Sequence, residues 1–471
     1  MLRNWLKENL WLSTIIIVAS VFYLVGLGHL PLQDADEATY AIIAREMIAS
    51  GDYGTLRFFS DPWVDKPPLL FWMMAASVKI FGLDEFSLRL PSAIFGMVAA
   101  LFTAGIIRQL TKNKEAALLG SLALIGLPLF LAAARNIRFD VPVTAAILGG
   151  VYFFLLGRTK PYSWLGVGVS VGLGIILKSV IGLLTIPILG IFSILHKNWS
   201  WLKNKYIWLG ATLGIAIALP WHIYEMLSLG SNFFSRYFGF HLRIASENFI
   251  HSQISNSYLL WVFWKYGQPL SAVFLLGLVA YLWILLTKNK NDYWRPVLRS
   301  GGFCLLTIIC IVMIFTISKT RLVTYWIPTY PFMAIFLGAI YAGTLDQIKK
   351  PQKNILRILA ILIILGNFAF AANEAWFASK LYITKVAVEE KQIGLVLAKT
   401  SRPAYLYEHP HDQTIQYYAQ RKITHLTAEE NITPETPFYM VIPTKLIPQN
   451  RWLEDFITLY KGADLTLFGV E

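Results

Sequence analysis

The sequence predicts a mostly helical, polytopic membrane protein that ends in a small α/β domain. Its 471 residues are 56% hydrophobic and 15% charged, whereas an average soluble domain has about 25% charged residues. The hydrophobic residues gather in runs of about 20, the length that crosses a bilayer as a helix. A soluble protein with this composition would expose a large apolar surface. The composition therefore excludes a soluble enzyme, a disordered chain and a disulfide scaffold.

The basic residues indicate a membrane partner rather than a nucleic acid. The net charge of +13 comes from short basic clusters between the apolar runs. Cytoplasmic loops carry such clusters, and anionic lipids attract them. The sequence shows no basic stripe, zinc-finger spacing or Walker-type glycine loop. The two cysteines, Cys304 and Cys310, lie in one apolar run and are expected to be core residues.

About eleven apolar runs have the length of a membrane span. The first follows two basic residues and shows no small-residue cleavage site, so we interpret it as an anchor that stays in the protein. The expected spans are 10–28, 90–108, 116–133, 141–157, 162–177, 180–196, 206–221, 268–287, 299–317, 324–343 and 355–373.

One further segment, 68–82, is apolar but short, and Lys79 interrupts it. If it crossed the membrane, the basic loop at 108–114 and every later basic loop would be inverted. If it lies in the interface, all the basic loops fall on one side. The positive-inside rule makes that side cytoplasmic. The charges therefore predict an interfacial helix at 68–82 and a cytoplasmic N-terminus.

The same topology puts the end of the chain outside the cell membrane. Residues 374–471 are more polar and contain alternating runs such as AYLYEH and DLTLFGV, which are typical of strands. About a hundred residues are enough for a modest core. We therefore expect a membrane domain over 1–373, with an outer loop at 29–89, and a periplasmic or extracellular α/β domain over 374–471.

Ionisable residues gather on the predicted outer face, next to the membrane. Charges at such positions tend to be paired and functional, although loop charges can also be merely solvated. Three acidic residues within 34–37 can cap a helix or present a carboxylate for proton transfer or cation binding. Lys178 lies between apolar residues and has no acidic neighbour in sequence. It needs a partner from another loop, and a substrate phosphate would also serve.

This combination of side chains suits group transfer from a lipid phosphate. A carboxylate can deprotonate an acceptor hydroxyl, and cations stabilise the charge of a departing phosphate. The carboxylates are Asp36, Asp65 and Asp140, and the cations are Lys66, Lys178, Arg243 and Lys319.

Several motifs, in order, resemble the dolichyl-phosphate-mannose–protein mannosyltransferase-like family. They are DADEATYAIIAREMIASGDY, VDKPPLLFWMMAASVKIFG and DEFSLRLPSAIFG, followed by ARNIRFD, LKSVIGLL, ALPWHIY, FGFHLRI and SKTRLVTYWIPTYP. The bacterial GT-C group of this family includes the aminoarabinose transferase that acts on lipid A. The resemblance covers most of 30–345. It implies a GT-C fold in a bacterial inner membrane, with the active site on the outer face.

The resemblance also implies a reaction and the residues that perform it. A sugar would move, with inversion, from a polyprenyl-phosphate donor to a hydroxyl of a lipid A-like glycolipid, a protein or a glycan. Asp36 would activate that hydroxyl, with Glu37 and Tyr40 as structural companions, and Asp140 would have a positioning role. The implied residues are Asp36 and Asp140 for catalysis, and Glu37, Tyr40, Lys66, Lys178, Arg243, Lys319 and Tyr325 for substrate binding.

In two places the sequence departs from the aminoarabinose transferases. Their lysine follows a glutamate that binds a metal together with a loop histidine. Here Asp65 and His241 are the candidate ligands of a divalent metal such as zinc, magnesium or manganese, while the displacement itself requires no cofactor. Thr39 stands where those enzymes usually have an arginine, which argues against the same acceptor.

A transporter or flippase for an anionic lipid or lipid-linked sugar is the alternative, because the same cations could line a path. Transporters place charged sites near the bilayer midplane and commonly contain repeated halves. Here the charges gather on one face, and no repeat is visible. An accessory protein that kept only the fold is a third interpretation, and the intact Asp36, Asp140 and Lys66 argue against it.

Overall fold

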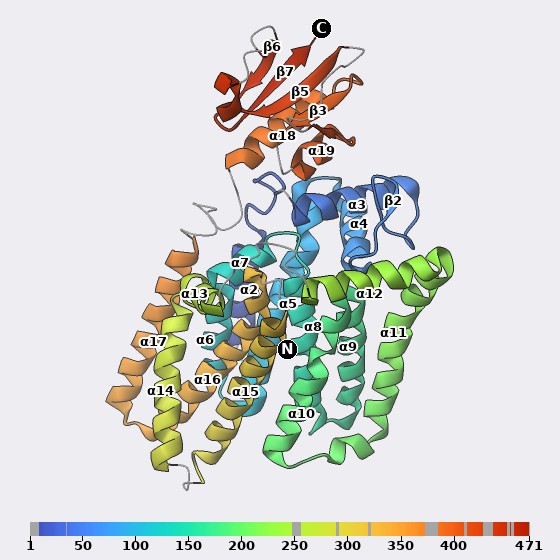
Figure 1. The fold of residues 1–471 in the computed structure, drawn as a ribbon. Coiled ribbons are helices and arrows are strands. Elements are labelled where there is room, and N and C mark those ends of the chain that lie inside the picture. The colour runs from blue at the N-terminus through green and yellow to red at the C-terminus, as the bar shows by residue number, and fades with distance from the viewer. Residues whose placement is uncertain are drawn as a thin grey trace. The chain divides into compact units, whose positions relative to one another are not determined.

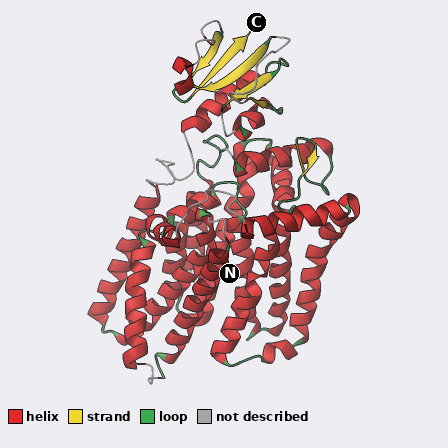
Figure 2. Cartoon of the chain, in the orientation of Figure 1, coloured by secondary structure: helices red, strands yellow, loops and turns green. Residues whose placement is uncertain are grey.

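The computed structural model describes residues 9–33, 35–246, 256–288, 292–318, 322–372, 385–408, 412–426, 437–449, 453 and 456–470. Helices make up most of this part of the chain, and a small sheet lies near the C-terminus (Figures 1 and 2). By packing, the chain forms two compact units. Unit 1 consists of Met1–Val25, Val64–Leu70 and Leu90–Ala378, and unit 2 of Gly26–Trp63, Phe71–Arg89 and Ser379–Glu471.

Unit 1 is a bundle of long apolar helices. Among the described residues, eight helices are long and apolar enough to cross a membrane, or nine if a bent pair counts as one span. The helices are α2 (Leu10–Leu24), α5 (Glu85–Thr111, which begins in unit 2), α6 (Lys114–Ile125), α7 (Pro128–Ala134), α8 (Asp140–Gly157), α9 (Leu165–Lys178), α10 (Thr185–His196), α11 (Lys205–Leu229), α12 (Ser231–Ser246), α13 (Asn256–Tyr266), α14 (Leu270–Lys288), α15 (Arg295–Ile317), α16 (Tyr330–Gln347) and α17 (Lys350–Ala371).

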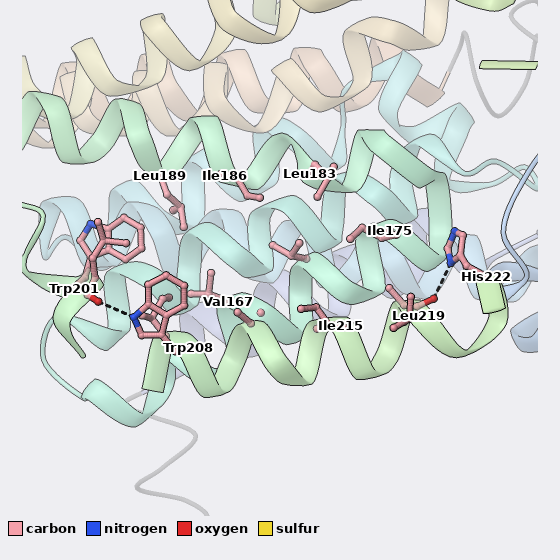
Figure 3. A pocket seen from close by; sticks show the side chains of 17 residues that line it. Val167, Ile175, Leu183, Ile186, Leu189, Trp201, Trp208, Ile215, Leu219 and His222 are labelled. Atoms are coloured by element: carbon pink, nitrogen blue, oxygen red, sulfur yellow. Dashed lines mark hydrogen bonds between the residues drawn. The ribbon is translucent and has the colours of Figure 1, made fainter. Parts of the chain in front are cut away.

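Every expected span contains helix, and one of them is bent. The run 116–133 is α6 and α7, bent by 71° where Pro128 begins the second helix. The runs 162–177 and 180–196 are α9 and α10, separated by Ser179 with φ +50°. Ile175 and Leu183 face each other across this break (Figure 3). The total of about eleven spans stays a prediction.

Glycines bring α9 and α11 into close contact. Gly168 faces the backbone of Gly210, and Gly172 faces that of Gly214. A Cβ atom on Gly168 would lie 1.8 Å from the Gly210 carbonyl oxygen, so no larger residue fits there. Small residues of this kind let membrane helices approach and pack closely. The pairs Gly168–Gly210 and Gly172–Gly214 therefore fix the spacing of two helices that line the groove described below.

Unit 2 begins with the loop after α2 and contains α3 (Asp36–Ser50), the hairpin of β1 (Arg57–Phe58) and β2 (Asp61–Pro62), and most of α4 (Leu69–Phe81). The 13 residues of α4 are too few to cross a bilayer as a helix, which agrees with the prediction that 68–82 is not a span. Its place at the membrane interface stays a prediction.

The rest of unit 2 is the C-terminal α/β fold, as predicted. Its five strands have the order β4–β3–β5–β7–β6; β3 is parallel to β4 and β5, and the pairs of β7 are antiparallel. Ile393, Leu406, Ile415 and Leu467 pack in its core. The elements are α18 (Lys385–Leu397), β3 (Ala404–Tyr407), α19 (Gln413–Ala419), β4 (Thr424–Leu426), β5 (Phe438–Pro443), β6 (Ile457–Lys461) and β7 (Leu465–Val470). The boundary expected at 373 lies outside the described residues.

Candidate functional site

The predicted site residues divide between the two units. Lys319 lies outside the described residues, and the side chain of His241 is likewise not described. The remaining residues are Asp36, Glu37 and Tyr40 in unit 2, and Asp65, Lys66, Asp140, Lys178, Arg243 and Tyr325 in unit 1.

In unit 1, Lys178 and Asp140 form a buried ion pair. The Lys178 Nζ donates to the Asp140 Oδ1 at 2.5 Å, and the two side chains are 17% and 8% exposed. Asp140 is the first residue of α8 and Lys178 the last of α9. A carboxylate at a helix N-terminus and an ammonium at a helix C-terminus are each stabilised by the helix dipole. Lys178 thus has the partner from another loop that its apolar surroundings require.

A second set of hydrogen bonds begins at the residue next to this pair in the chain. Ser179 follows Lys178, and its hydroxyl lies 2.5 Å from the hydroxyl of Tyr237 on α12. The same Tyr237 hydroxyl lies 3.0 Å from His222 Nε2 on α11. Burial raises the pKa of Tyr237 to about 12, so its phenol stays protonated near neutral pH. Three helices therefore meet around one small polar cluster.

Beside this cluster lies an apolar groove of about 620 Å³, lined by residues of α9, α10, α11 and the turns between them. Figure 3 shows Val167, Ile175, Leu183, Leu189 and Ile215 along it. His222 lies at one end and the Trp201 and Trp208 rings at the other (Figure 3). His222 therefore belongs both to the apolar groove and to the hydrogen-bonded cluster.

The other unit 1 residues differ in exposure. The Lys66 Nζ lies 4.4 Å from the centre of the Phe240 ring on α12, a cation–π contact. Arg243, three residues further along α12, is exposed. Tyr325 is buried and stacks on Phe315, with ring centres 4.5 Å apart. The substrate-binding roles expected for these residues stay predictions.

In unit 2, Asp36 is the first residue of α3 and is half-buried. Ala35 before it has φ +61°, a conformation that an L-residue other than glycine adopts at a cost. Backbone strain of this kind persists only where the surrounding structure holds it. Asp36 therefore sits on a sharp turn whose geometry must be maintained by its neighbours.

Glu37 and Arg89 supply much of that support. Arg89 Nε and Nη2 donate to the two carboxylate oxygens of Glu37 at 2.8 and 2.9 Å. The guanidinium also donates to the carbonyl oxygens of Leu27, Leu30 and Pro31. The backbone N–H of Gln33 donates to the Glu37 carboxylate. Arg89 is 2% exposed. This pair ties the DADEATY motif to the DEFSLRLP motif.

Tyr40 lies one turn into α3 and is buried among aromatic rings. Its ring contacts Trp63 edge-on, with centres 6.0 Å apart, and Phe71, with centres 5.8 Å apart. Trp63 and Phe71 also contact each other. Tyr40 is therefore held in an aromatic cluster, and the roles expected for Glu37 and Tyr40 stay predictions.

The expected metal site does not take shape in the described residues. No group of three His, Cys, Asp or Glu side chains that could hold an ion occurs among them. One aspartate and one histidine fall short of the three protein ligands typical of a catalytic zinc site. Because the side chain of His241 is outside the described part of the chain, a metal held by Asp65 and His241 stays a prediction.

Sequence reasoning did not single out Arg89, Tyr237 or His222. Arg89 stands in the quoted DEFSLRLP motif, and an arginine at the start of an apolar helix could have signalled a buried partner. His222 stands in the quoted ALPWHIY motif. Tyr237 has no signal of its own, because its importance depends on which residues α9 and α11 bring to it.

Comparisons with known proteins agree with this fold. A family model described as dolichyl-phosphate-mannose-protein mannosyltransferase matches residues 65–224. An uncharacterized Aquifex aeolicus protein is 28% identical, over 99% of this chain and 97% of its own. An undecaprenyl phosphate-alpha-4-amino-4-deoxy-L-arabinose arabinosyl transferase of Pseudomonas fluorescens is 26% identical over 77% of this chain, and the match spans 61% of that enzyme.

Among solved structures, the crystal structure of ArnT from Cupriavidus metallidurans bound to undecaprenyl phosphate is similar over 98% of both chains. The TM-score is 0.74 and the sequence identity 18%. These matches confirm the resemblance that the motifs indicated, and the fold prediction with it. By sequence and fold together, this chain is a multi-pass membrane protein with the GT-C fold, and it resembles the aminoarabinose transferases.

Proposed function

We propose that the protein transfers a sugar from a polyprenyl-phosphate donor to an acceptor hydroxyl, with inversion at the anomeric carbon. One observation carries the proposal. Lys178, which is paired with Asp140, is followed in the chain by Ser179. The Ser179 hydroxyl is hydrogen-bonded to Tyr237, and Tyr237 contacts His222 at one end of an apolar groove. A cationic head site next to an apolar channel matches a phosphate attached to a hydrocarbon chain. The named relatives and the ligand of the ArnT structure support the same donor class.

In the proposed reaction, Lys178, Lys66 and Arg243 hold the donor phosphate, with Lys319 and Tyr325 as further contacts. Asp36 accepts the proton of the acceptor hydroxyl while its oxygen bonds to the anomeric carbon. The bond from that carbon to the phosphate oxygen breaks, and its electron pair leaves with the polyprenyl phosphate. The cations stabilise the charge on this leaving group. A phosphate leaving group is already ionised near neutral pH and needs no general acid.

Asp140 acts on Lys178 rather than on the sugar. A lysine that already has a carboxylate partner binds a phosphate less tightly than an isolated one, because part of its field is neutralised. The pair therefore orients the ammonium and keeps the product phosphate releasable. The acceptor is a lipid A-like glycolipid, a protein or a glycan, and the sugar a pentose or hexose.

The reaction takes place, on this proposal, at the outer face of a bacterial inner membrane. The N-terminus is then cytoplasmic, and the C-terminal domain periplasmic or extracellular. Support comes from the positions of the basic loops. Fluorescent and phosphatase reporters fused after residue 160 and after residue 471 test this arrangement. Activity of the phosphatase reporter at 160, or of a cytoplasm-only reporter at 471, would reverse it.

The proposal requires no cofactor. Purified protein treated with a chelator should transfer sugar at its original rate. Loss of transfer that returns on addition of zinc, magnesium or manganese would show instead that a metal is needed, and would direct attention to Asp65 and His241.

The central test uses purified protein in lipid nanodiscs with polyprenyl-phosphate sugars, and a membrane extract as the source of acceptor. Release of free polyprenyl phosphate is followed for wild type, Asp36→Asn and Asp61→Asn. Asp61 is an exposed aspartate of the β1–β2 hairpin and serves as the matched control. Wild type and Asp61→Asn should release the product, and Asp36→Asn should be slower by about 10²-fold or more.

Two outcomes would contradict the proposal. Release of product by Asp36→Asn at the wild-type rate would show that Asp36 is not the base. Wild type releasing nothing from any donor, while moving lipid between leaflets, would instead make the protein a transporter.

A further inference from the structure

The loop before Asp36 is held from two sides by one helix face. Glu85 and Arg89 are four residues apart on α5 and so lie on the same face. Arg89 binds the carbonyl oxygens of the loop and the Glu37 carboxylate, as described above. Glu85 instead binds side chains of the C-terminal fold, and these belong to the same unit. The C-terminal fold therefore contacts the same face of α5 that holds the loop.

Tyr418 and Thr414 of α19 contact the loop directly, and the Thr414 hydroxyl donates to the Leu32 carbonyl oxygen at 3.5 Å. The Tyr418 hydroxyl accepts a hydrogen bond from the Leu32 amide at 2.9 Å and donates one to Glu85 Oε1 at 2.7 Å. The Lys391 Nζ of α18 contacts the same carboxylate oxygen at 2.5 Å. Leu32 is fully buried and Tyr418 is 8% exposed. A buried backbone amide needs a partner, and here a side chain 386 residues away in sequence supplies it.

The two hydrogen bonds of the Tyr418 hydroxyl form a bridge from the Leu32 amide to Glu85. The protonation state of Tyr418 suits this bridge. Burial raises the pKa of the Tyr418 phenol above its usual range, so the hydroxyl remains protonated at physiological pH. It can then donate to Glu85 while one of its lone pairs accepts the Leu32 N–H. Tyr418 therefore stays the donor to Glu85 and the acceptor from Leu32 at physiological pH.

Docking of α19 on the rest of unit 2 has other supports. Arg45 of α3 donates to the Tyr417 carbonyl oxygen at 2.6 Å, and its guanidinium lies 5.3 Å from the centre of the Tyr417 ring. Neither contact involves the Tyr418 hydroxyl. Removal of that one oxygen should therefore leave the fold of the unit in place while it frees the Leu32 amide.

We propose that Tyr418 is a positioning residue for sugar transfer, because its hydroxyl fixes the loop that presents the Asp36 carboxylate. Leu32 lies four residues before Asp36, and the strained turn at Ala35 lies between them. Release of the Leu32 amide lets this turn relax and moves the carboxylate. Misplacement of a reacting group by about 1 Å can cost about 10²-fold in rate. The inference rests on the proposed function, since it takes Asp36 as the base.

The experiment compares wild type, Tyr418→Phe and Tyr417→Phe in nanodiscs. Tyr417→Phe keeps the ring and the carbonyl that Arg45 contacts, and is the matched control. Three quantities are measured: kcat and KM for transfer, the affinity for polyprenyl phosphate alone, and hydrogen exchange of the peptide over 30–40. For Tyr418→Phe we expect kcat to fall about 10- to 100-fold, donor affinity to change less than about twofold, and exchange of the peptide to accelerate.

Several results would overturn the proposal. Unchanged kcat in a folded Tyr418→Phe protein is one, and an equal loss of kcat and donor affinity together with a lower Tm is another. If Tyr418→Phe fails to fold, Lys391→Met provides the second variant, because it removes the ammonium that contacts Glu85 and the Tyr418 ring while the Tyr418 hydroxyl stays. A smaller fall in kcat with unchanged donor affinity then supports the proposal, and unchanged kcat overturns it.

Failure of the proposed function would be visible separately. If wild type transfers no sugar, the reaction fails, yet the exchange measurement still reports on the bridge. Faster hydrogen exchange of the peptide over 30–40 in Tyr418→Phe, but not in Tyr417→Phe, would show that the C-terminal fold holds the loop. Exchange identical to wild type would show that it does not.

Discussion

Two buried ion pairs, one in each unit, differ in how completely their donors are used. In unit 2, the Arg89 guanidinium makes five hydrogen bonds, two of them to Glu37, and the side chains are 2% and 6% exposed. In unit 1, the Lys178 ammonium makes one hydrogen bond to Asp140 within the described part of the chain, and is 17% exposed. An arginine with every donor occupied can hold structure but cannot take a ligand.

The lysine is different because an ammonium group has three N–H donors. With one donor directed to Asp140, it can still bind an oxygen of a substrate phosphate. The comparison thus separates a pair that maintains a loop from a pair that is suited to bind an anion. Four substitutions test this distinction, in order of decreasing expected effect.

Arg89→Met should have the largest effect, on stability. It removes the two hydrogen bonds from Arg89 to the Glu37 carboxylate and those to three loop carbonyl groups, and breaking a buried pair in this way costs about 3–5 kcal/mol. Thermal unfolding in nanodiscs measures the change. Arg57→Met is the control, because Arg57 and Asp52 are partly exposed and 3.7 Å apart and ion pairs near the surface contribute about 0–1 kcal/mol. A Tm equal to that of wild type for Arg89→Met would refute the structural role.

Lys178→Met should weaken donor binding more than it weakens the fold. A hydrogen bond to a charged group contributes about 1.5–3 kcal/mol, so the affinity for polyprenyl phosphate should fall about 10- to 100-fold. Titration of the lipid into nanodiscs measures it. Lys160→Met, at an exposed loop position, should bind like wild type. Equal affinities for the two variants would mean that Lys178 is only the partner of Asp140.

Ala211→Trp tests the apolar half of the same site. Ala211 lines the groove, and an indole there would displace several methylene groups, each contributing about 0.8 kcal/mol when buried. Affinity for a long-chain polyprenyl phosphate should fall about 10-fold, and that for a short-chain analogue should not change. Ile194→Trp, at an exposed α10 position that does not line the groove, is the control. The same loss for both chain lengths would place the lipid elsewhere.

Tyr237→Phe should have the smallest effect. It removes a neutral hydrogen-bonded link between Ser179 and His222, and such bonds contribute about 0.5–1.5 kcal/mol, or about 2- to 10-fold in donor affinity. The pH dependence provides a second check. Because burial raises the pKa of Tyr237 to about 12, its contribution is complete below pH 10 and is lost as the pH rises through 12. A loss of wild-type affinity near pH 10 that Tyr237→Phe lacks would contradict this.

Much of the fold could be predicted because apolar run length alone specifies a membrane helix. The helices at 116–133 and 180–196 show this, since both were expected from hydropathy. The bend at Pro128 depends on local backbone geometry and was not expected, whereas the break at Ser179 lies between two runs that were expected as separate spans. The C-terminal sheet was recognisable from alternation in AYLYEH and DLTLFGV, whereas the order of its strands depends on tertiary pairing.

The candidate site was predictable residue by residue but not pair by pair. Lys178 and Asp140 were both expected to matter, yet nothing in the sequence joins two residues 38 positions apart. The Glu37–Arg89 and Tyr418–Leu32 contacts are further examples, with separations of 52 and 386 residues. Periodicity reports which face of a helix is buried, and carries no information about which buried groups meet.

The placement of Asp140 at the beginning of α8 has a consequence for how an anion enters the site. A carboxylate on the first turn of a helix keeps the favourable field of the backbone amides whether or not a cation lies beside it. On the proposed function, the two remaining N–H donors of Lys178 can therefore bind an incoming phosphate while the first stays on Asp140. Release of the product then leaves the ion pair as it was before binding.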